Sequence, residues 1–439
     1  MKTLKLNSTQ IIIGSFISAL FIGAFLLMLP ISTNSGHSTD FLTCVFTSTS
    51  SLCVTGLVMV DTATHWSFFG QCVILVLIQI GGMGVIVVTS IISVYLGKKI
   101  GLIQRATLQE ALAVQSVGGI IKLTKFTLKI ILIVELTGAL LLFVNFIQDF
   151  NFSTAVWYSI FHSVSAFCNA GFDLMGVKEP FSSLTTYQAS VPINLIIMFL
   201  IVFGGIGFTV WNDLLNKKFS VKKYNLQTKI VLFTTLILII FPAILFYIYE
   251  YKLLDTPTRV LSSLFQSVTT RTAGFNTADF GEMTEVGKAI SIILMLIGGS
   301  PGSTAGGMKT TTFAILVIST FSVFKRQNEP HIFNRRINIQ TLKNAMTVFM
   351  MYMNLFFVFG FTICKIEGIS LIDALFETAS AIGTVGLTLG ITTKLSSLSH
   401  ILLIILMFLG RVGGLTFIYA IIPALSKEPG YISEKIAIG

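Results

Sequence analysis

Long apolar runs separated by short polar segments dominate the chain. A helix that crosses a membrane needs about 20 mostly apolar residues. Such runs lie near 11–29, 70–96, 123–147, 191–214, 230–249, 345–364 and 400–425, and an eighth, near 287–324, is interrupted by glycines. Shorter half-apolar segments lie near 40–53, 153–167, 256–270 and 370–382. Because these are too short to cross a membrane and too apolar for ordinary loops, we expect re-entrant half-helices.

Composition supports a membrane protein. Of the 439 residues, 54% are apolar and only 11% are charged, against about 25% charged in soluble domains. This excludes soluble enzymes, DNA-binding proteins and disordered chains. The five cysteines show no CxxC or Cys/His spacing, so we expect packing residues rather than a disulfide framework or a zinc site: Cys44, Cys53, Cys72, Cys168 and Cys364.

Charge orients the chain. Of the 29 Lys and Arg, 20 lie in the two termini and in the loops 97–129, 215–229 and 325–343, while the opposite loops hold six. The positive-inside rule then predicts a multi-pass plasma-membrane protein with both termini in the cytoplasm. The net charge of +10 therefore reflects topology, and no nucleic-acid partner is expected. The remaining three, Arg271, Lys309 and Arg411, lie at membrane depth.

The order of span, re-entrant segment and span occurs four times. The re-entrant segments FTSTSSLCVTGL, FHSVSAFCNAGF, FQSVTTRTAGFNT and FETASAIGTVGL each begin with Phe and carry a late glycine: Gly56, Gly171, Gly274 and Gly386. The second spans share QIGGMG, FGGIGF, IGGSPG and GRVGGL, which close helix packing would also explain. We predict an all-α polytopic membrane protein of four repeats arranged pseudo-fourfold around one central pore: 1–97, 98–216, 217–326 and 327–439.

Irregular backbone at membrane depth survives only when it is buried in protein or lines a water-filled path. A dehydrated cation in such a path needs oxygen ligands, which backbone carbonyls supply without fixed charge. Glycine reaches the positive φ angles that turn carbonyls inward. Each half-helix also directs its carbonyl-rich end at the cavity below, where a cation is favoured. The pattern thus favours a cation pore.

The VTG, NAG, TAG and TVG fragments, with RTAGFNT at 271–277 and GGSPGSTAGGMKT at 298–310, resemble the Trk/Ktr/HKT superfamily of potassium transporters. The chain is most similar to the membrane subunit of a bacterial Ktr potassium-uptake system. The resemblance implies potassium (K+) uptake stimulated by sodium (Na+) and no covalent cofactor. It also implies a homodimer and a cytosolic ring of regulatory subunits of the RCK/KTN type, which carry the nucleotide. Basic loops such as 215–229 and 325–343 are candidate docking surfaces for that ring.

The resemblance also assigns a potassium selectivity filter to four short segments, which we call the filter stretches. Glycine at the last position of all four goes with potassium preference in the family, and serine in the first repeat goes with sodium. The four stretches are Cys53-Val54-Thr55-Gly56, Cys168-Asn169-Ala170-Gly171, Arg271-Thr272-Ala273-Gly274 and Gly383-Thr384-Val385-Gly386.

Residues 298–308, which we call the glycine-rich loop, interrupt the third repeat's second span, where a continuous helix is not expected. The family implies an obstructing gate under the filter; a kink filled by neighbouring helices is the alternative. The gate residues are Gly298, Gly299, Ser300, Pro301, Gly302, Ser303, Thr304, Ala305, Gly306 and Gly307, together with Arg411. Arg411 acts as an electrostatic brake in the family, and a structural ion pair is the alternative.

Several polar residues at membrane depth remain. We expect Arg271 to point behind the filter, tied to backbone or to Glu377, and His162 to be a hydrogen-bonded packing residue. Glu135 either pairs with a buried base or packs as a polar group. Two other classes compete with a pore. An alternating-access cation symporter would show inverted repeats, and an intramembrane enzyme would need catalytic clusters that the sequence lacks.

Overall fold

The computed structural model describes residues 8–85, 87, 88, 90, 105, 107–109, 119–218, 220–327 and 329–421. The expected repeat boundary at 97, much of the loop 97–129 and both chain ends lie outside these residues. The described part is almost entirely helical, as expected for an all-α polytopic membrane protein. Its one small sheet is a hairpin of β1 (His331–Ile332) and β2 (Arg335–Arg336).

Each repeat opens with one long apolar helix. These four helices are long and apolar enough to cross a membrane, and only 22% to 44% of their apolar windows is buried inside the protein. On α7, for example, Leu132, Leu136, Leu140 and Val144 are 49% to 67% exposed along one face, which suits contact with lipid. The four are α1 (Ser8–Leu27), α7 (Ile120–Phe146), α11 (Leu226–Tyr249) and α15 (Ile339–Glu367).

A short helix follows in each repeat, where the sequence predicts a re-entrant segment. A side chain caps the start of each one: Asp40, Asn151, Asp255 and Ser370 accept from a backbone N–H three residues on. Such caps satisfy amides that a helix start leaves free. We call these short helices the pore helices, after the pore that the sequence predicts: α2 (Phe41–Leu52), α8 (Phe152–Cys168), α12 (Thr256–Thr269) and α16 (Leu371–Gly383).

The second spans differ from the prediction. The sequence predicts continuous spans at 70–96, 191–214 and 400–425, but helices stop at Gly84, Gly207 and Gly413, whose φ angles are 88°, 104° and 87°. Glycine reaches these left-handed angles at little cost, so the helices break there. Between α9 and α10 the break is a bend of 93°. The pieces are α4 (Phe68–Met83), α9 (Val191–Ile206), α10 (Phe208–Lys217), α17 (Ser397–Val412) and α18 (Gly414–Ile421).

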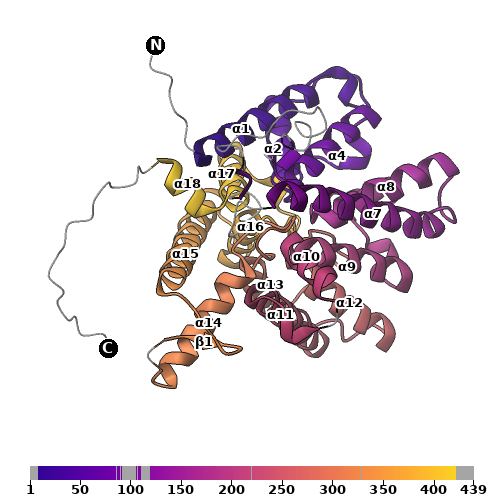
Figure 1. Ribbon diagram of the computed structural model, residues 1–439. Coiled ribbons are helices and arrows are strands. Elements are labelled where there is room, and N and C mark those ends of the chain that lie inside the picture. The colour runs from indigo at the N-terminus through magenta and orange to yellow at the C-terminus, as the bar shows by residue number, and fades with distance from the viewer. Residues whose placement is uncertain are drawn as a thin grey trace, which may run out of the picture.

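The second span of the third repeat is interrupted as expected, between α13 (Glu285–Leu296) and α14 (Thr310–Phe324). The four groups of helices lie in chain order around a common centre (Figure 1). Short helices complete the connections: α3 (Thr62–His65), η1 (Pro30–Ser32), η2 (Met175–Val177), η3 (Thr185–Tyr187), η4 (Val221–Lys223) and η5 (Thr392–Lys394).

Candidate ion pathway

The four filter stretches share one backbone conformation. Their final glycines have φ angles of 92°, 69°, 85° and 89°. The residue two positions earlier is also left-handed in every stretch, although it is never glycine: Val54, Asn169, Thr272 and Thr384, at φ of 57°, 58°, 69° and 50°. Non-glycine residues pay roughly 1–2 kcal/mol for this conformation. Its repetition in four unlike sequences indicates that the surrounding structure imposes it.

The four glycines close a ring. A Cβ atom placed on any of them would fall within 3 Å of the carbonyl oxygen that precedes the glycine of the next repeat. Real Cβ atoms essentially never approach backbone so closely. In chain order the pairs are Gly56 with Ala170 (2.5 Å), Gly171 with Ala273 (2.8 Å), Gly274 with Val385 (2.6 Å) and Gly386 with Thr55. Repeat four therefore meets repeat one, and the stretches surround a single axis.

Hydroxyl side chains hold each stretch from behind. Ser50 Oγ accepts from the Gly56 N–H at 3.1 Å, and Ser380 Oγ accepts from the Gly386 N–H at 3.0 Å. Ser165 Oγ donates to the Phe172 carbonyl at 2.7 Å, and Thr269 Oγ1 donates to the Phe275 carbonyl. These hydroxyl residues are not among the site residues predicted from the sequence. The available signal was a hydroxyl residue six positions before the glycine in three repeats and five in the other.

Glycines of the second spans pack against the pore helices. A Cβ on Gly81, Gly204 or Gly410 would collide with the carbonyl of Leu52, Phe167 or Ile382, respectively. Each of these carbonyls lies in the last turn of the pore helix of the same repeat. Close helix packing, the alternative explanation for these motifs, therefore accounts for three of the shared glycines. The helix breaks lie at a later glycine in each motif.

The glycine-rich loop has no helical residues and closes on itself at its ends. Gly298 N–H donates to Met308 O at 2.7 Å, and Thr310 N–H donates to Gly299 O at 3.0 Å. Its middle binds the bend of the second repeat. Ser300 N–H donates to Gly205 O at 3.0 Å, and Phe208 N–H donates to Gly302 O at 2.8 Å. The loop of the third repeat and the bend of the second repeat thus satisfy each other's backbone hydrogen-bonding groups.

The loop also touches the filter stretches. Asn169 Nδ2 donates to Thr304 Oγ1 at 2.8 Å, and that hydroxyl donates to Phe167 O at 2.9 Å. Both Asn169 and Thr304 are fully buried. On the other side, a Cβ on Gly307 would lie 2.9 Å from Gly383 O. The loop therefore lies against the start of the second and fourth filter stretches.

Two cations flank the loop. Arg411 donates to the carbonyls of Thr304, Gly81 and Gly82, the last at 3.2 Å. Lys309 Nζ donates to Ala305 O at 2.8 Å. No ion pair within 4 Å joins Arg411 to a carboxylate among the described residues, so its guanidinium joins the loop to the bend of the first repeat through carbonyl oxygens instead.

Two other buried polar residues, His162 and Glu135, differ in how far their polar atoms are satisfied. His162 is fully buried, with Nδ1 2.7 Å from Tyr158 O and Nε2 accepting from Leu174 N–H, as expected of a packing residue. Glu135 accepts from Gln79 Nε2 at 3.3 Å and has no basic partner within 4 Å in the described part of the chain.

The expected tie between Arg271 and Glu377 is not found. Glu377 accepts from Thr392 Oγ1 at 2.8 Å, from Leu389 N–H at 3.2 Å and from the Thr388 hydroxyl. These donors satisfy the carboxylate locally. Arg271 is buried, and its Nε has no hydrogen-bond partner in the described part of the chain.

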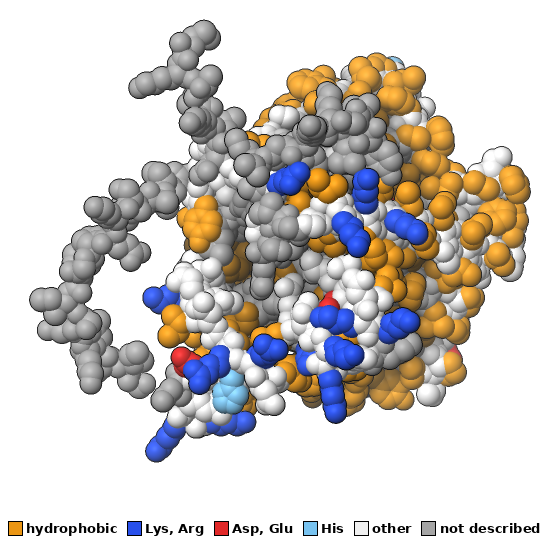
Figure 2. Space-filling model, viewed as in Figure 1, with side chains coloured by type: hydrophobic (Ala, Val, Ile, Leu, Met, Phe, Trp, Pro, Cys, Tyr) orange, Lys and Arg blue, Asp and Glu red, His pale blue; other side chains and the backbone are white. Residues whose placement is uncertain are grey.

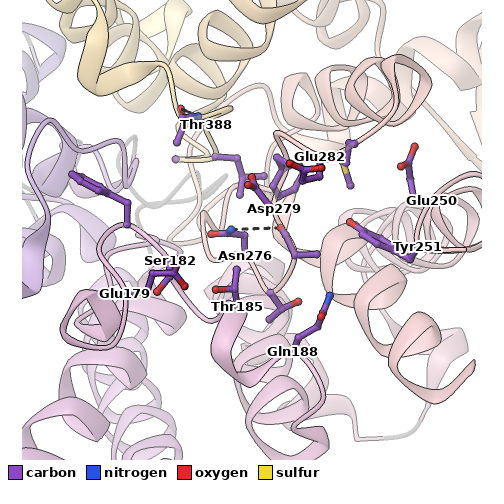
Figure 3. A pocket seen from close by; sticks show the side chains of 18 of the residues that line it. Glu179, Ser182, Thr185, Gln188, Glu250, Tyr251, Asn276, Asp279, Glu282 and Thr388 are labelled. Carbon is purple, nitrogen blue, oxygen red and sulfur yellow. Dashed lines mark hydrogen bonds between the residues drawn. The ribbon is translucent and has the colours of Figure 1, made fainter. Parts of the chain in front are cut away.

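A cavity of about 770 Å³ opens on the opposite side of the filter from the loop. Gly386 and the residues that follow it line one wall, and loops of the second and third repeats line the others. Figure 3 shows its polar side chains. Its charged lining is one basic residue, Lys252, and four acidic ones: Glu179, Glu250, Asp279 and Glu282. Because a cleft whose lining is mostly of one sign of charge concentrates the opposite ions, this acidic cavity favours cations.

Known proteins resemble this chain over nearly its whole length. The family described as TrkH, cation transport protein, matches residues 4–428. Potassium/sodium uptake protein NtpJ of Enterococcus hirae is 38% identical, over 99% of this chain and 98% of that protein. Ktr system potassium uptake protein B of Bacillus subtilis is 38% identical, over 100% and 98%. The crystal structure of the potassium transporter TrkH from Vibrio parahaemolyticus shares the fold, with a TM-score of 0.76 at 19% identity over 96% of this chain and 86% of that one.

Proposed function

Because the chain belongs to the TrkH family of cation transport proteins, we propose that it takes up potassium across the plasma membrane through the ring of filter stretches. The observation that carries this proposal is the closed contact of the four left-handed glycines in chain order. The names of the most similar relatives describe potassium or potassium/sodium uptake, which fits a transporter rather than an enzyme.

The ring gives potassium a dry but polar passage. Burying an unpaired charge in an apolar medium costs tens of kcal/mol in the idealised limit, so carbonyl oxygens must replace the lost water. The carbonyl oxygens of Thr55, Ala170, Ala273 and Val385 lie beside the ring glycines. We assign these oxygens as the ligands of the potassium ion. Glycine at all four final positions leaves the ring free of side chains, in keeping with potassium preference in the superfamily.

The glycine-rich loop is the gate in this proposal. It lies against the inner end of two filter stretches, and backbone bonds and Arg411 hold it there. Few apolar side chains anchor it, and segments of low local stability are those that move. A partner that binds the retracted position more tightly would open the path by population shift.

Partners and topology complete the proposal. The words "Ktr system" in the names of three relatives imply a further component. We assign this role to a cytosolic ring of RCK/KTN-type subunits that carry the nucleotide. A homodimer, stimulation by sodium and cytoplasmic termini belong to the same proposal, the last because most basic residues lie on one side.

Ion competition in proteoliposomes tests the transport proposal. Isotope uptake should be potassium-selective when potassium, rubidium and sodium compete, and it should run down a gradient through the purified protein. Saturating flux with a fixed coupling stoichiometry would favour the alternating-access symporter instead.

Deleting part of 299–306 tests the gate. Removing the obstruction should give high flux that no longer depends on a partner or nucleotide. A deletion variant that folds normally, yet stays closed until the partner and its nucleotide are added, would place the gate elsewhere.

A further inference from the structure

A basic groove lies on the face that carries the loops 215–229 and 325–343. It encloses about 880 Å³ between the turn 222–225, the first turn of α11 and the tip of the β1–β2 hairpin. Its lining includes five basic residues, Lys222, Lys223, Lys229, Arg335 and Arg336, and no acidic one among the described residues. Figure 2 shows Lys and Arg gathered on this face, with hydrophobic side chains around its edge.

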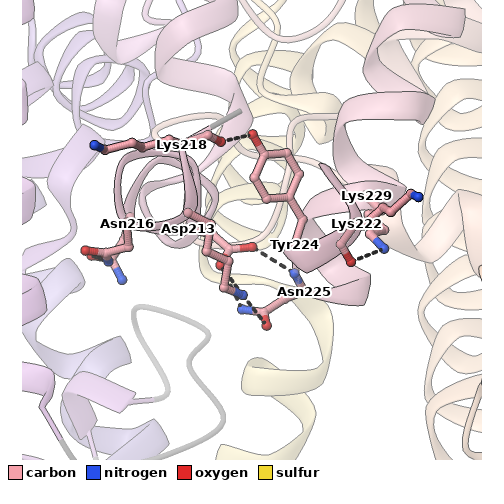
Figure 4. A network of polar contacts seen from close by, with 9 residues as sticks. Asp213, Asn216, Lys218, Lys222, Tyr224, Asn225 and Lys229 are labelled. Atoms are coloured by element: carbon pink, nitrogen blue, oxygen red, sulfur yellow. Dashed lines mark hydrogen bonds and ion pairs between the residues drawn. The ribbon is translucent and has the colours of Figure 1, made fainter. Parts of the chain in front are cut away.

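Local bonds give the groove a fixed shape. Asp213 accepts from Asn225 N–H at 2.8 Å and pairs with Lys217 at 2.6 Å, which anchors the turn before α11 (Figure 4). Lys229 Nζ donates to Lys222 O at 3.1 Å across the same turn. On the far wall, Phe333 and Asn334 form the two-residue tip of the hairpin, both left-handed, with φ of 50° and 60°. Bonds within the chain thus define both walls of the groove.

The charge of the groove is largely uncompensated. Arg336 pairs with Glu329 at 3.0 Å, and the other four basic lining residues have no carboxylate within 4 Å among the described residues. Like charges that share one cavity repel, and an anion placed between them relieves that repulsion. The groove is therefore built for a negatively charged group.

The surroundings identify the anion. Lys229 lies in the first turn of α11, a helix long and apolar enough to cross a membrane. Its Nζ lies 5.9 Å from the centre of the Phe333 ring, and that ring packs edge-on against Phe233 of α11, with centroids 6.5 Å apart. Phe233 and Phe333 are 54% and 45% exposed. The basic groove thus adjoins exposed aromatic side chains through Lys229, an arrangement that a phospholipid matches and a free anion does not.

We propose that this groove binds the phosphate headgroup of an anionic phospholipid, whose acyl chains lie along the exposed face of α11. The assignment to the cytoplasmic leaflet rests on the proposed orientation of the chain. Anionic lipids are abundant in that leaflet, and each nearby basic residue strengthens their binding. The hairpin connects α14 to α15, so a bound lipid would join the segment after the glycine-rich loop to α11.

Lipid titration of the purified full-length protein tests the proposal, because binding is read without transport. Phosphatidylglycerol should bind tightly, and phosphatidylcholine should not. The variant Lys222→Gln/Lys223→Gln/Arg335→Gln should bind phosphatidylglycerol about 100-fold more weakly. The matched control, Lys122→Gln/Lys125→Gln/Lys129→Gln, removes three exposed charges from the first turns of α7 and should retain the affinity. If the triple variant does not fold, Lys223→Gln alone should weaken binding about fivefold.

Three results would overturn the assignment. Equal losses in both triple variants would indicate diffuse surface charge. Displacement of phosphatidylglycerol by inorganic phosphate at similar concentrations would indicate a free-anion site. Unchanged lipid binding in the groove variant, together with loss of the regulatory subunit's effect on flux, would assign the groove to that subunit.

Discussion

The hydrogen bond from Asn169 to Thr304 joins the second filter stretch to the glycine-rich loop, and its removal should loosen the proposed gate. Asn169→Gly deletes the amide donor but keeps the backbone, because glycine adopts φ near 58° without strain. Thr304 keeps its own bond to Phe167 O, so no buried hydroxyl is abandoned. The variant therefore isolates one contact between filter and gate.

The magnitude follows from a single neutral hydrogen bond. Such a bond contributes about 0.5–1.5 kcal/mol net, so losing it should raise the minor open population about 2- to 10-fold. Rubidium flux into proteoliposomes without any partner should rise by that factor. Thr304→Val should raise flux at least as much, because it also removes the bond to Phe167 O. Thr304→Ser, which keeps the hydroxyl, should retain the low flux of the unmodified protein.

Thr272→Gly provides the matched control. Thr272 occupies the same left-handed position in the third stretch, and its buried hydroxyl has no partner among the described residues. Flux in Asn169→Gly equal to that in Thr272→Gly would refute the reasoning. The double variant Asn169→Gly/Thr304→Val should not exceed Thr304→Val alone, since both substitutions remove the bond between Asn169 and Thr304; additive effects would show that the two residues act separately.

Two further predictions concern the ring and its brake. Gly56→Ser should narrow the preference for potassium over sodium, because a Cβ at φ of 92° would lie 2.5 Å from Ala170 O and distort the carbonyl ring; unchanged relative uptake of the two ions would contradict this. Arg411→Ala should raise flux without a partner, about 10-fold or more, because the loop loses its charged hydrogen bond at Thr304 O, which contributes roughly 1.5–3 kcal/mol. Normal protein yield with unchanged or reduced flux would rule out the brake.

The repeated Phe-to-Gly segments were enough to predict the architecture. The positions that must be glycine for steric reasons, Gly56, Gly171, Gly274 and Gly386, are also those that the repeats share. A position that needs a positive φ angle and has no room for a Cβ atom can be recognised in the sequence, because only glycine meets both requirements. The pore helices were predictable for a similar reason, since their length and apolar content fit neither a span nor a loop.

Features that depend on partners distant in sequence were not predictable. The helix breaks at Gly84 and Gly207 could not be told from packing sites in the sequence, because close packing and a helix break both use glycine. Arg411 finds carbonyls rather than a carboxylate, and carbonyls leave no signal in a sequence. The two-residue strands that form one wall of the basic groove are too short to show an alternating pattern.

The order of contacts around the glycine ring has a genetic consequence. In a pore built from four identical subunits, one codon change alters every wall at once. Here the neighbours Gly56 and Gly386 belong to a single gene product but to different repeats, so each wall can diverge while the other three preserve the passage. Asn169 already differs from Val54, Thr272 and Thr384 at the equivalent position. Because the four repeats differ in sequence, selection can give one repeat a role that the other three lack, such as the contact with the proposed gate.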